Sequence, residues 1–252
     1  MPGLLALLAF TPIAGTDVPD AIEAGASQNY FYVEPSYNGT NIVLFGSIDR
    51  ERLNRHKFDV AITIRGPVKP MTIWKKDRRA GLWVNSESLT FEDVPTYYAL
   101  LSTRPASEIA STEQRKAHEL GPDALNLEPK DSPKLEAQSL DEFRNALIRL
   151  RKTAGLFVEN GDSAIEFFGT RLFRSSVFLP PAAGAGLYRA KFYLLQDGKV
   201  IGEAAAQIRI NKIGIEARLS SAALNYPWLY GAMAVLLAAA IGGGASAIFR
   251  RV

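Results

Sequence analysis

Histidines and paired carboxylates are the side chains of this 252-residue chain whose chemistry is most easily put to use. The two histidines, His56 and His118, lie far apart in the sequence, and neither has metal-ligand spacing around it. Glu92 and Asp93 are adjacent, so on a strand they point to opposite faces and do not share a proton or a metal ion. We therefore predict no catalytic residue, no metal site and no cofactor.

The motif inventory points the same way. The chain has no cysteine, which excludes a disulfide framework, a thiolate metal site and a cysteine nucleophile. It also lacks a G-x-S-x-G elbow, a P-loop, an H-E-x-x-H helix and a dinucleotide fingerprint. We expect a binding or accessory protein rather than an enzyme. The alternative is an enzyme whose Asp, Glu and His groups are assembled by the fold around His56 or His118.

A cluster of cations marks a predicted hairpin end. Two β-rich runs, Lys69–Lys76 and Ala80–Asn85, are separated by the polar residues Asp77-Arg78-Arg79, which we interpret as the turn. The candidate partner contacts here are Lys75, Lys76, Arg78 and Arg79. Such a tip can contact an anionic partner or a membrane surface, although a solvated tip is the simpler interpretation. The net charge of +3 is too small to indicate nucleic-acid binding.

The C-terminal run Tyr226–Phe249 contains no charged residue and predicts a transmembrane helix over 226–249. At about 1.5 Å per residue it spans roughly 36 Å, more than the bilayer core of about 30 Å. Aromatic residues cluster at its start, and Arg250 and Arg251 follow its end. Because flanking cations tend to stay cytoplasmic, we expect the C-terminus inside and the body outside. The alternative is a helix buried in a soluble core.

Small residues recur along this run. Ala238, Gly242 and Ser246 are spaced by four, and Gly243 lies one step round the helix. Such a face lets a second helix pack closely, so these residues are candidate contacts with another integral membrane protein or with a second copy. Absence of a specific partner is an equally good interpretation.

Export is predicted by the N-terminal residues. The apolar stretch Leu4–Ile13 is too short to span a bilayer and is followed by small residues, so we expect residues 1–15 to be a secretory signal peptide. No lysine or arginine precedes the stretch, which means either that the start is truncated or that the signal is unusual.

The body, expected at 28–219, alternates between strand and helix signals. Asp197-Gly198 between two alternating runs predicts a hairpin. Helical and Pro-rich segments predict an internal insertion at about 105–155. Its clearest helix has Ser139 as N-cap and Glu142 completing a capping box. The expected apolar stripe of that helix is Leu140, Phe143, Leu147, Leu150 and Ala154, followed by a stop at Gly155. We interpret Arg144, Arg149, Arg151 and Lys152 as a solvated basic face, with binding of anionic partners or lipid headgroups as the alternative.

Tyr188, two residues after Gly186 at the entrance to a strand, is similar to the tyrosine corner of immunoglobulin-like domains. With the six or more predicted strands, this indicates a mainly β protein: an antiparallel immunoglobulin-like β-sandwich with an internal helical insertion and one C-terminal transmembrane helix. Two small domains divided in the Pro-rich stretch are the alternative.

A set of short motifs resembles an uncharacterised alphaproteobacterial family of putative transmembrane proteins. Between Gly66 and Pro105 the chain reads R-G-P, a basic hairpin, G-x-W-V-N, F-x-x-V-P, a tyrosine and S-x-R-P in the family's order. Later matches are "FRNALIRLR", "RLFRSSVFLP", "GLYRAKFYLLQDGKVIG" and a final Phe-Arg-Arg. The resemblance implies an exported protein with a single anchor. It also implies that family members are encoded near sulfite-exporter-type permeases. It transfers no catalytic residue.

These observations predict a single-pass protein of the bacterial inner membrane with its body in the periplasm and its C-terminus in the cytoplasm. We expect it to act as a binding or accessory module, for example an auxiliary subunit of a permease. Besides the enzyme alternative, a structural protein of envelope assembly that associates with itself is a third interpretation.

Overall fold

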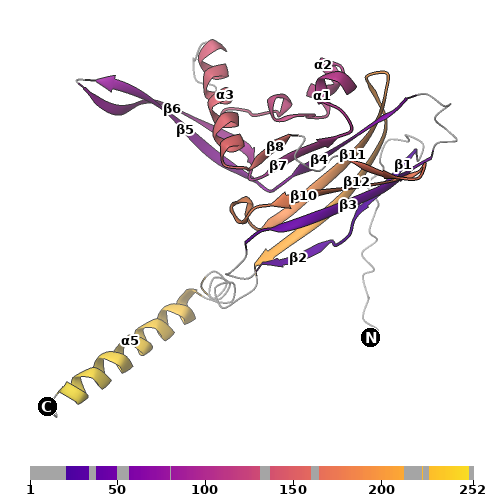
Figure 1. The fold of residues 1–252 in the computed structure, drawn as a ribbon. Coiled ribbons are helices and arrows are strands. Elements are labelled where there is room, and N and C mark those ends of the chain that lie inside the picture. The colour runs from indigo at the N-terminus through magenta and orange to yellow at the C-terminus, as the bar shows by residue number, and fades with distance from the viewer. Residues whose placement is uncertain are drawn as a thin grey trace, which may run out of the picture.

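The computed structural model describes residues 21–33, 38–49, 57–79, 81–130, 137–159, 165–212, 223 and 227–249. Within these ranges the protein is mainly β, with two larger, largely antiparallel sheets and one long hairpin (Figure 1). Residues 1–15, where a signal peptide is predicted, lie outside the described residues, as do His56, Arg250 and Arg251.

The smaller sheet has the strand order β1-β3-β10-β9 and is antiparallel throughout. Its strands are β1 (Ile22–Ala26), β3 (Thr40–Ile48), β9 (Glu166–Phe168) and β10 (Leu172–Leu179). In β3 the buried side chains Ile42, Leu44 and Ile48 alternate with more exposed ones, the period expected of a strand with one face on a core. Gly46 continues this face, and a Cβ there would come within 2.4 Å of the Phe173 ring.

The larger sheet has the order β2-β12-β11-β4-β7-β8. Its central pairs are antiparallel, whereas β2 and β8 join the two edges in parallel. Its strands are β2 (Tyr30–Val33), β4 (Asp59–Arg65), β7 (Tyr98–Ser102), β8 (Phe157–Glu159), β11 (Gly186–Gln196) and β12 (Lys199–Lys212).

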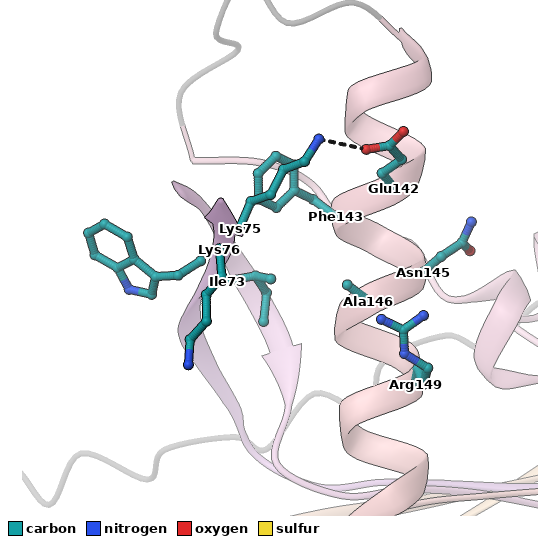
Figure 2. Close-up of a pocket in the computed structure, with 9 residues that line it drawn as sticks. Ile73, Lys75, Lys76, Glu142, Phe143, Asn145, Ala146 and Arg149 are labelled. Atoms are coloured by element: carbon teal, nitrogen blue, oxygen red, sulfur yellow. Dashed lines mark hydrogen bonds and ion pairs between the residues drawn. The ribbon is translucent and has the colours of Figure 1, made fainter. Parts of the chain in front are cut away.

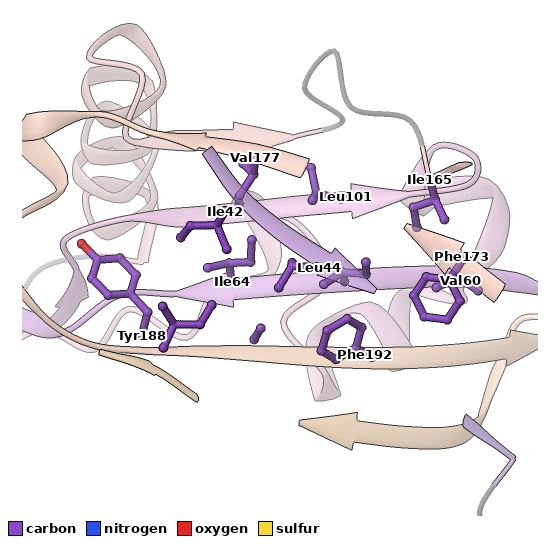
Figure 3. Packing of buried hydrophobic residues seen from close by; sticks show 14 of the residues in the cluster. Ile42, Leu44, Val60, Ile64, Leu101, Ile165, Phe173, Val177, Tyr188 and Phe192 are labelled. Atoms are coloured by element: carbon purple, nitrogen blue, oxygen red, sulfur yellow. The ribbon is translucent and has the colours of Figure 1, made fainter. Parts of the chain in front are cut away.

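A hydrophobic core fills the space between the two sheets (Figure 3). The smaller sheet contributes Ile42 and Phe173, and the larger sheet contributes Ile64, Leu101 and Phe192, all of them buried. At about 25 cal/mol per Å² of apolar surface, each such side chain contributes about 1.5–3 kcal/mol to folding. This core therefore holds the two sheets face to face.

The larger sheet is covered on its second face as well. In β4, five consecutive residues are buried, from Val60 to Ile64, which is the pattern of a strand enclosed on both sides. Ala61 and Leu100 belong to a second core that they share with Phe91 and Leu147, from the base of the long hairpin and a helix. The molecule thus has a third layer, made mostly of helices.

This layer contains α1 (Ala106–Ile109), α2 (Thr112–Ala117), η2 (Pro122–Ala124) and α3 (Ala137–Thr153). Ser111 caps α2, because its hydroxyl accepts a hydrogen bond from the Gln114 amide at 3.3 Å. A further 3-10 turn, η3 (Pro181–Ala183), precedes β11.

Helix α3 starts earlier than its sequence signals indicate. It begins at Ala137, so Ser139 lies inside the helix and is not its N-cap. The stop at Gly155 is confirmed: φ is +67° there, and the Leu156 amide bonds the Arg151 carbonyl at 3.0 Å, as in a Schellman motif.

The buried face of α3 also differs from the predicted stripe. Phe143 and Leu147 are buried as expected, but Leu150 is 56% exposed and Ala154 is exposed too. Ile148 is buried instead, because the last two turns direct positions 148 and 151 toward the sheet and the hairpin base.

Two hairpins organise the remaining strands. The turn predicted at Asp197-Gly198 joins β11 to β12, and both of its residues have positive φ, 49° and 78°. The long hairpin pairs β5 (Val68–Arg79) with β6 (Leu82–Pro95) and extends beyond the body (Figure 1). The turn expected at Asp77-Arg78-Arg79 is wrong, because β5 continues to Arg79, which pairs with Leu82.

The Tyr188 corner predicted from the sequence is present. Tyr188 is fully buried, and its hydroxyl lies 2.8 Å from the Ala183 carbonyl oxygen and 2.6 Å from that of Gly184. The hydroxyl therefore ties the start of β11 to the turn just before it.

Helix α5 (Pro227–Phe249) extends away from the β body (Figure 1). Among the described residues, no helix combines the length and the apolar character needed to cross a membrane. The transmembrane helix expected at 226–249 stays a prediction.

Candidate functional site

The predicted hairpin cations lie on an exposed arm. We use "hairpin arm" for the part of β5 and β6 between the paired residues Trp74 and Ser88 and the turn after Arg79. At about 3.3 Å per residue the arm is roughly 17–20 Å long. Lys75, Lys76, Arg78 and Arg79 all lie on β5 within it.

The arm combines these cations with exposed apolar side chains. Arg78 pairs with Trp83, and directly opposed residues of an antiparallel pair share a face. Leu82 is 70% exposed and Trp83 is 69% exposed. Large apolar side chains gathered at one exposed place are typical of an interaction surface.

A groove of about 470 Å³ separates the arm from α3 (Figure 2). Ile73 of β5 points toward the helix, and Phe143 and Ala146 of α3 face the arm. At one end Lys75 Nζ lies 3.1 Å from Glu142 Oε2, and this contact raises the pKa of the Lys75 ammonium through its hydrogen bond and the carboxylate charge. Because both groups are about half exposed, the pair adds little to stability.

Two arginines of α3 fix the helix to the body. Arg144 Nη2 donates to the carbonyl oxygens of Asp123 at 3.1 Å and Leu125 at 2.5 Å. Arg151 Nη2 donates to the carbonyls of Pro95 and Thr96 at the hairpin base. The solvated basic face predicted for α3 is therefore wrong at these two positions.

Arg151 is also partly desolvated. Its guanidinium lies 5.4 Å from the centre of the Phe157 ring, and burial lowers its pKa. Arg151 therefore ties the C-terminal part of α3 to the hairpin base at Pro95 and Thr96.

A second, more polar cleft of about 470 Å³ lies over the larger sheet, between β11 and the residues that follow α2. Arg65 and Glu119 meet in it, with Arg65 Nη1 2.5 Å from Glu119 Oε2. Glu119 has φ of +51°, and its other oxygen, Oε1, accepts a hydrogen bond from the Asn126 amide at 3.1 Å. The carboxylate is thus held from both sides.

Tyrosines form the floor of this cleft. Tyr98 donates its hydroxyl proton to the Glu119 carbonyl at 2.5 Å and accepts a hydrogen bond from the Gly121 amide at 2.9 Å. Burial raises the pKa of both Tyr98 and Tyr193, so both stay neutral at physiological pH. They are hydrogen-bonding groups here, not bases.

His118 is the predicted candidate that reaches this cleft. Its Nδ1 lies 3.0 Å from Glu203 Oε1, and its ring packs edge-on to Tyr193 with 5.0 Å between ring centres. Of the adjacent carboxylates considered from the sequence, Asp93 lines the cleft, and its carbonyl accepts a hydrogen bond from Arg65 at 3.4 Å. The described residues include no group of three or more His, Cys, Asp or Glu arranged to hold a metal ion.

Sequence reasoning did not find the remaining charged residues of the cleft, Arg65, Glu119, Arg189 and Lys191. One signal was available: Arg189 and Lys191 are two residues apart in the strand "GLYRAKFYLL", so they share a face. Which strand lies opposite could not be read from that spacing.

The small residues of the C-terminal run lie on α5. Ala238, Gly242 and Gly243 are exposed, and a Cβ built on either glycine would meet no described atom within 4 Å. The side chain of Ser246 lies outside the described residues. This face is accessible for packing along the part of α5 that is described.

One family model matches the chain, over residues 21–251, and its description is "Putative transmembrane protein (Alph_Pro_TM)". The match begins just before β1 and ends beyond α5, so it includes both the β body and the C-terminal helix. No curated protein matches the chain.

Proposed function

Because the chain belongs to the family described as "Putative transmembrane protein (Alph_Pro_TM)", we propose that it is a membrane-anchored binding or accessory protein of the bacterial cell envelope. In this proposal the run 226–249 is the single anchor in the inner membrane. The β body is periplasmic, behind a signal peptide, and Arg250 and Arg251 are cytoplasmic.

The anchor is supported by the character of the run. It contains no charged residue, and the described side chains of α5 face solvent, including Trp228 at 75% and Ile241 at 69% exposure. An uncharged run whose described side chains pack on no core requires an apolar environment. The family description agrees with a bilayer as that environment.

We also infer that the body is an immunoglobulin-like sandwich. Two sheets face each other across one core, and the Tyr188 hydroxyl bonds back to the turn before its strand. Because such a fold does not by itself decide function, the binding role rests on the surface features of the body.

The hairpin arm is the observation that carries the accessory role. It extends beyond the body and presents Trp83 and Leu82 beside Arg78, with no described element covering them (Figure 1). Tryptophan and arginine are the residue types that most often dominate binding energy at protein interfaces. We propose that the arm contacts another integral membrane protein, and that the small-residue face of α5 packs against the same partner.

The partner proposed is a transporter, of which this chain is an auxiliary subunit, and a sulfite-exporter-type permease is the first candidate. Photocrosslinking in native membranes tests this. p-Benzoylphenylalanine is introduced at Trp83, with Phe45 as the matched control, because Phe45 is also an exposed aromatic residue, 47% exposed, but lies on β3 of the smaller sheet.

Mass spectrometry of the crosslinked product is expected to identify a permease at position 83 and not at position 45. Products containing only a second copy of this chain would instead support the envelope-assembly interpretation. Recovery of no membrane protein at position 83 would contradict the accessory role.

An envelope enzyme is the second candidate, and the cleft favours it. His118, Asp93 and Glu119 line one cavity, and Glu203 fixes the orientation of the His118 imidazole as a carboxylate does for a general base. The Tyr193 ring packed against His118 and the ion pair that occupies Glu119 weigh against it. A hydrolytic activity of the full-length protein that is lost in His118→Gln would establish the enzyme instead.

A further inference from the structure

We propose that the cleft over the larger sheet binds a small organic anion through Arg65, Arg189 and Lys191, by a carboxylate or an oxoanion group. This inference does not depend on the accessory role, because it rests on side chains of the β body and not on the arm or α5.

The first argument is the register of β4 and β11. Arg65 and Arg189 are direct partners in this antiparallel pair, so both side chains leave the same face of the sheet. Lys191 is two residues further along β11 and shares that face. Like charges placed opposite each other destabilise a sheet, so a cluster of three cations needs compensation.

The chain supplies only part of this compensation. Glu119 pairs with Arg65 at 2.5 Å, whereas within the described part of the chain Arg189 and Lys191 have no ion-pair partner. Asp93 is the other carboxylate of the lining, and Glu203, which shares the face of Tyr193, contacts His118 at 3.0 Å. A bound anion would supply Arg189 and Lys191 with a partner.

The second argument is the shape and chemistry of the cavity. Its volume of about 470 Å³ is within the range of small-molecule sites, which is roughly 300–1,000 Å³. Its floor is formed by the buried residues Thr63, Tyr98 and Tyr193. Cations above an ordered, partly apolar floor suit an organic acid better than a bare inorganic ion.

The contacts of Glu119 show how the cleft binds a carboxylate. It is an internal carboxylate whose Oε2 already binds Arg65 and whose Oε1 accepts a hydrogen bond from the Asn126 backbone amide. Its main chain is in the left-handed region, and its carbonyl accepts a hydrogen bond from the Tyr98 hydroxyl. A ligand carboxylate is expected beside it, within reach of Arg189 and Lys191, at the open side of the cleft.

Calorimetric titration of the full-length protein in detergent tests the site. The probes are citrate, inorganic phosphate and sulfate, measured against a constant chloride background. The test variant is Arg189→Gln/Lys191→Gln, and the matched control is Arg174→Gln/Lys199→Gln, which removes the same charge from exposed positions outside the cleft.

We expect citrate to bind to the wild type and the control alike, and to bind at least 10-fold more weakly to Arg189→Gln/Lys191→Gln, since a tenfold change corresponds to the loss of about one charged hydrogen bond. The exchanged variant Arg189→Lys/Lys191→Arg keeps both charges and should retain affinity within about threefold. Circular dichroism melting checks that each variant is folded.

Equal affinity of the test variant and the control would overturn the proposal, because attraction would then depend on net charge alone. Failure of the wild type to bind any of the three probes at millimolar concentration would overturn it too. Neither result would bear on the crosslink from position 83, so the two proposals can fail separately.

Discussion

Asp59, at the start of β4, links the ionisation of one carboxylate to the stability of the larger sheet. Its Oδ2 lies 2.6 Å from Arg104 Nη2, and its Oδ1 accepts from Arg104 Nε at 3.0 Å and from the Thr103 hydroxyl at 2.8 Å. Burial raises the pKa of Asp59, but these hydrogen bonds and the charge of Arg104 outweigh it and hold the pKa below its usual value. The folded state therefore favours the carboxylate form.

The sign of the pH dependence follows. Because the folded pKa is below the unfolded one, which is about 3.9, the stabilisation is fully present above that value and is lost as pH falls through the folded pKa. We expect Asp59→Asn to lower the free energy of unfolding by about 1–2 kcal/mol at pH 7, measured by urea titration. The difference from the wild type should shrink below about pH 4.

Glu108→Gln is the matched control for this prediction. Glu108 also approaches Arg104, at 3.6 Å, but it is exposed and makes no bidentate contact. Its substitution should change stability by no more than about 0.5 kcal/mol. A deficit of Asp59→Asn that stays constant from pH 7 to pH 3 would contradict the proposed linkage.

The proposed contact between the small-residue face of helix α5 and a partner helix can be tested by substitution. Gly242→Leu places a bulky side chain on the small-residue face, whereas Ala240→Leu, two residues earlier, lies on roughly the opposite face at 3.6 residues per turn. If the face packs against a partner helix, Gly242→Leu should reduce the yield of the position-83 crosslink several-fold and Ala240→Leu should leave it unchanged. Equal yields from both variants would show that this face of the helix makes no partner contact.

Elements whose signals are local could be predicted from the sequence. The Asp197-Gly198 turn, the Gly155 stop and the Tyr188 hydrogen bond each depend on residues within a few positions of one another. The start of α3 was missed because serine is favoured at N-caps but is also tolerated inside a helix, and Ser139 lies inside this one.

The candidate sites were harder to predict, because they depend on contacts between distant residues. Arg65 and Glu119 are 54 positions apart, and Arg189 meets Arg65 only through the pairing of β4 with β11. Arg144 and Arg151 were predicted to be solvated. They donate instead to backbone carbonyls of residues distant in the sequence, and no local signal shows that these carbonyls lie nearby. The hairpin cations were located correctly on β5, but the groove beside them requires α3, whose position no local signal gives.

The whole molecule carries two proposed recognition features on one tethered body. The hairpin arm and the cleft over the larger sheet are formed by different residues of the β body. Helix α5 extends away from that body (Figure 1). This arrangement suits a protein that presents a bound ligand to a membrane partner, since the tether keeps the body close to that partner.

The membrane orientation of the chain is the decisive test of a single C-terminal anchor with a periplasmic body. Alkaline phosphatase and green fluorescent protein are each fused after Val252. The phosphatase is active only outside the cytoplasm, whereas green fluorescent protein fluoresces in the cytoplasm and stays dark when it is exported unfolded. A cytoplasmic C-terminus predicts bright fluorescence and no phosphatase activity in the membrane fraction. Phosphatase activity without fluorescence, or fluorescence only in the soluble fraction, would contradict a single C-terminal anchor with the body in the periplasm.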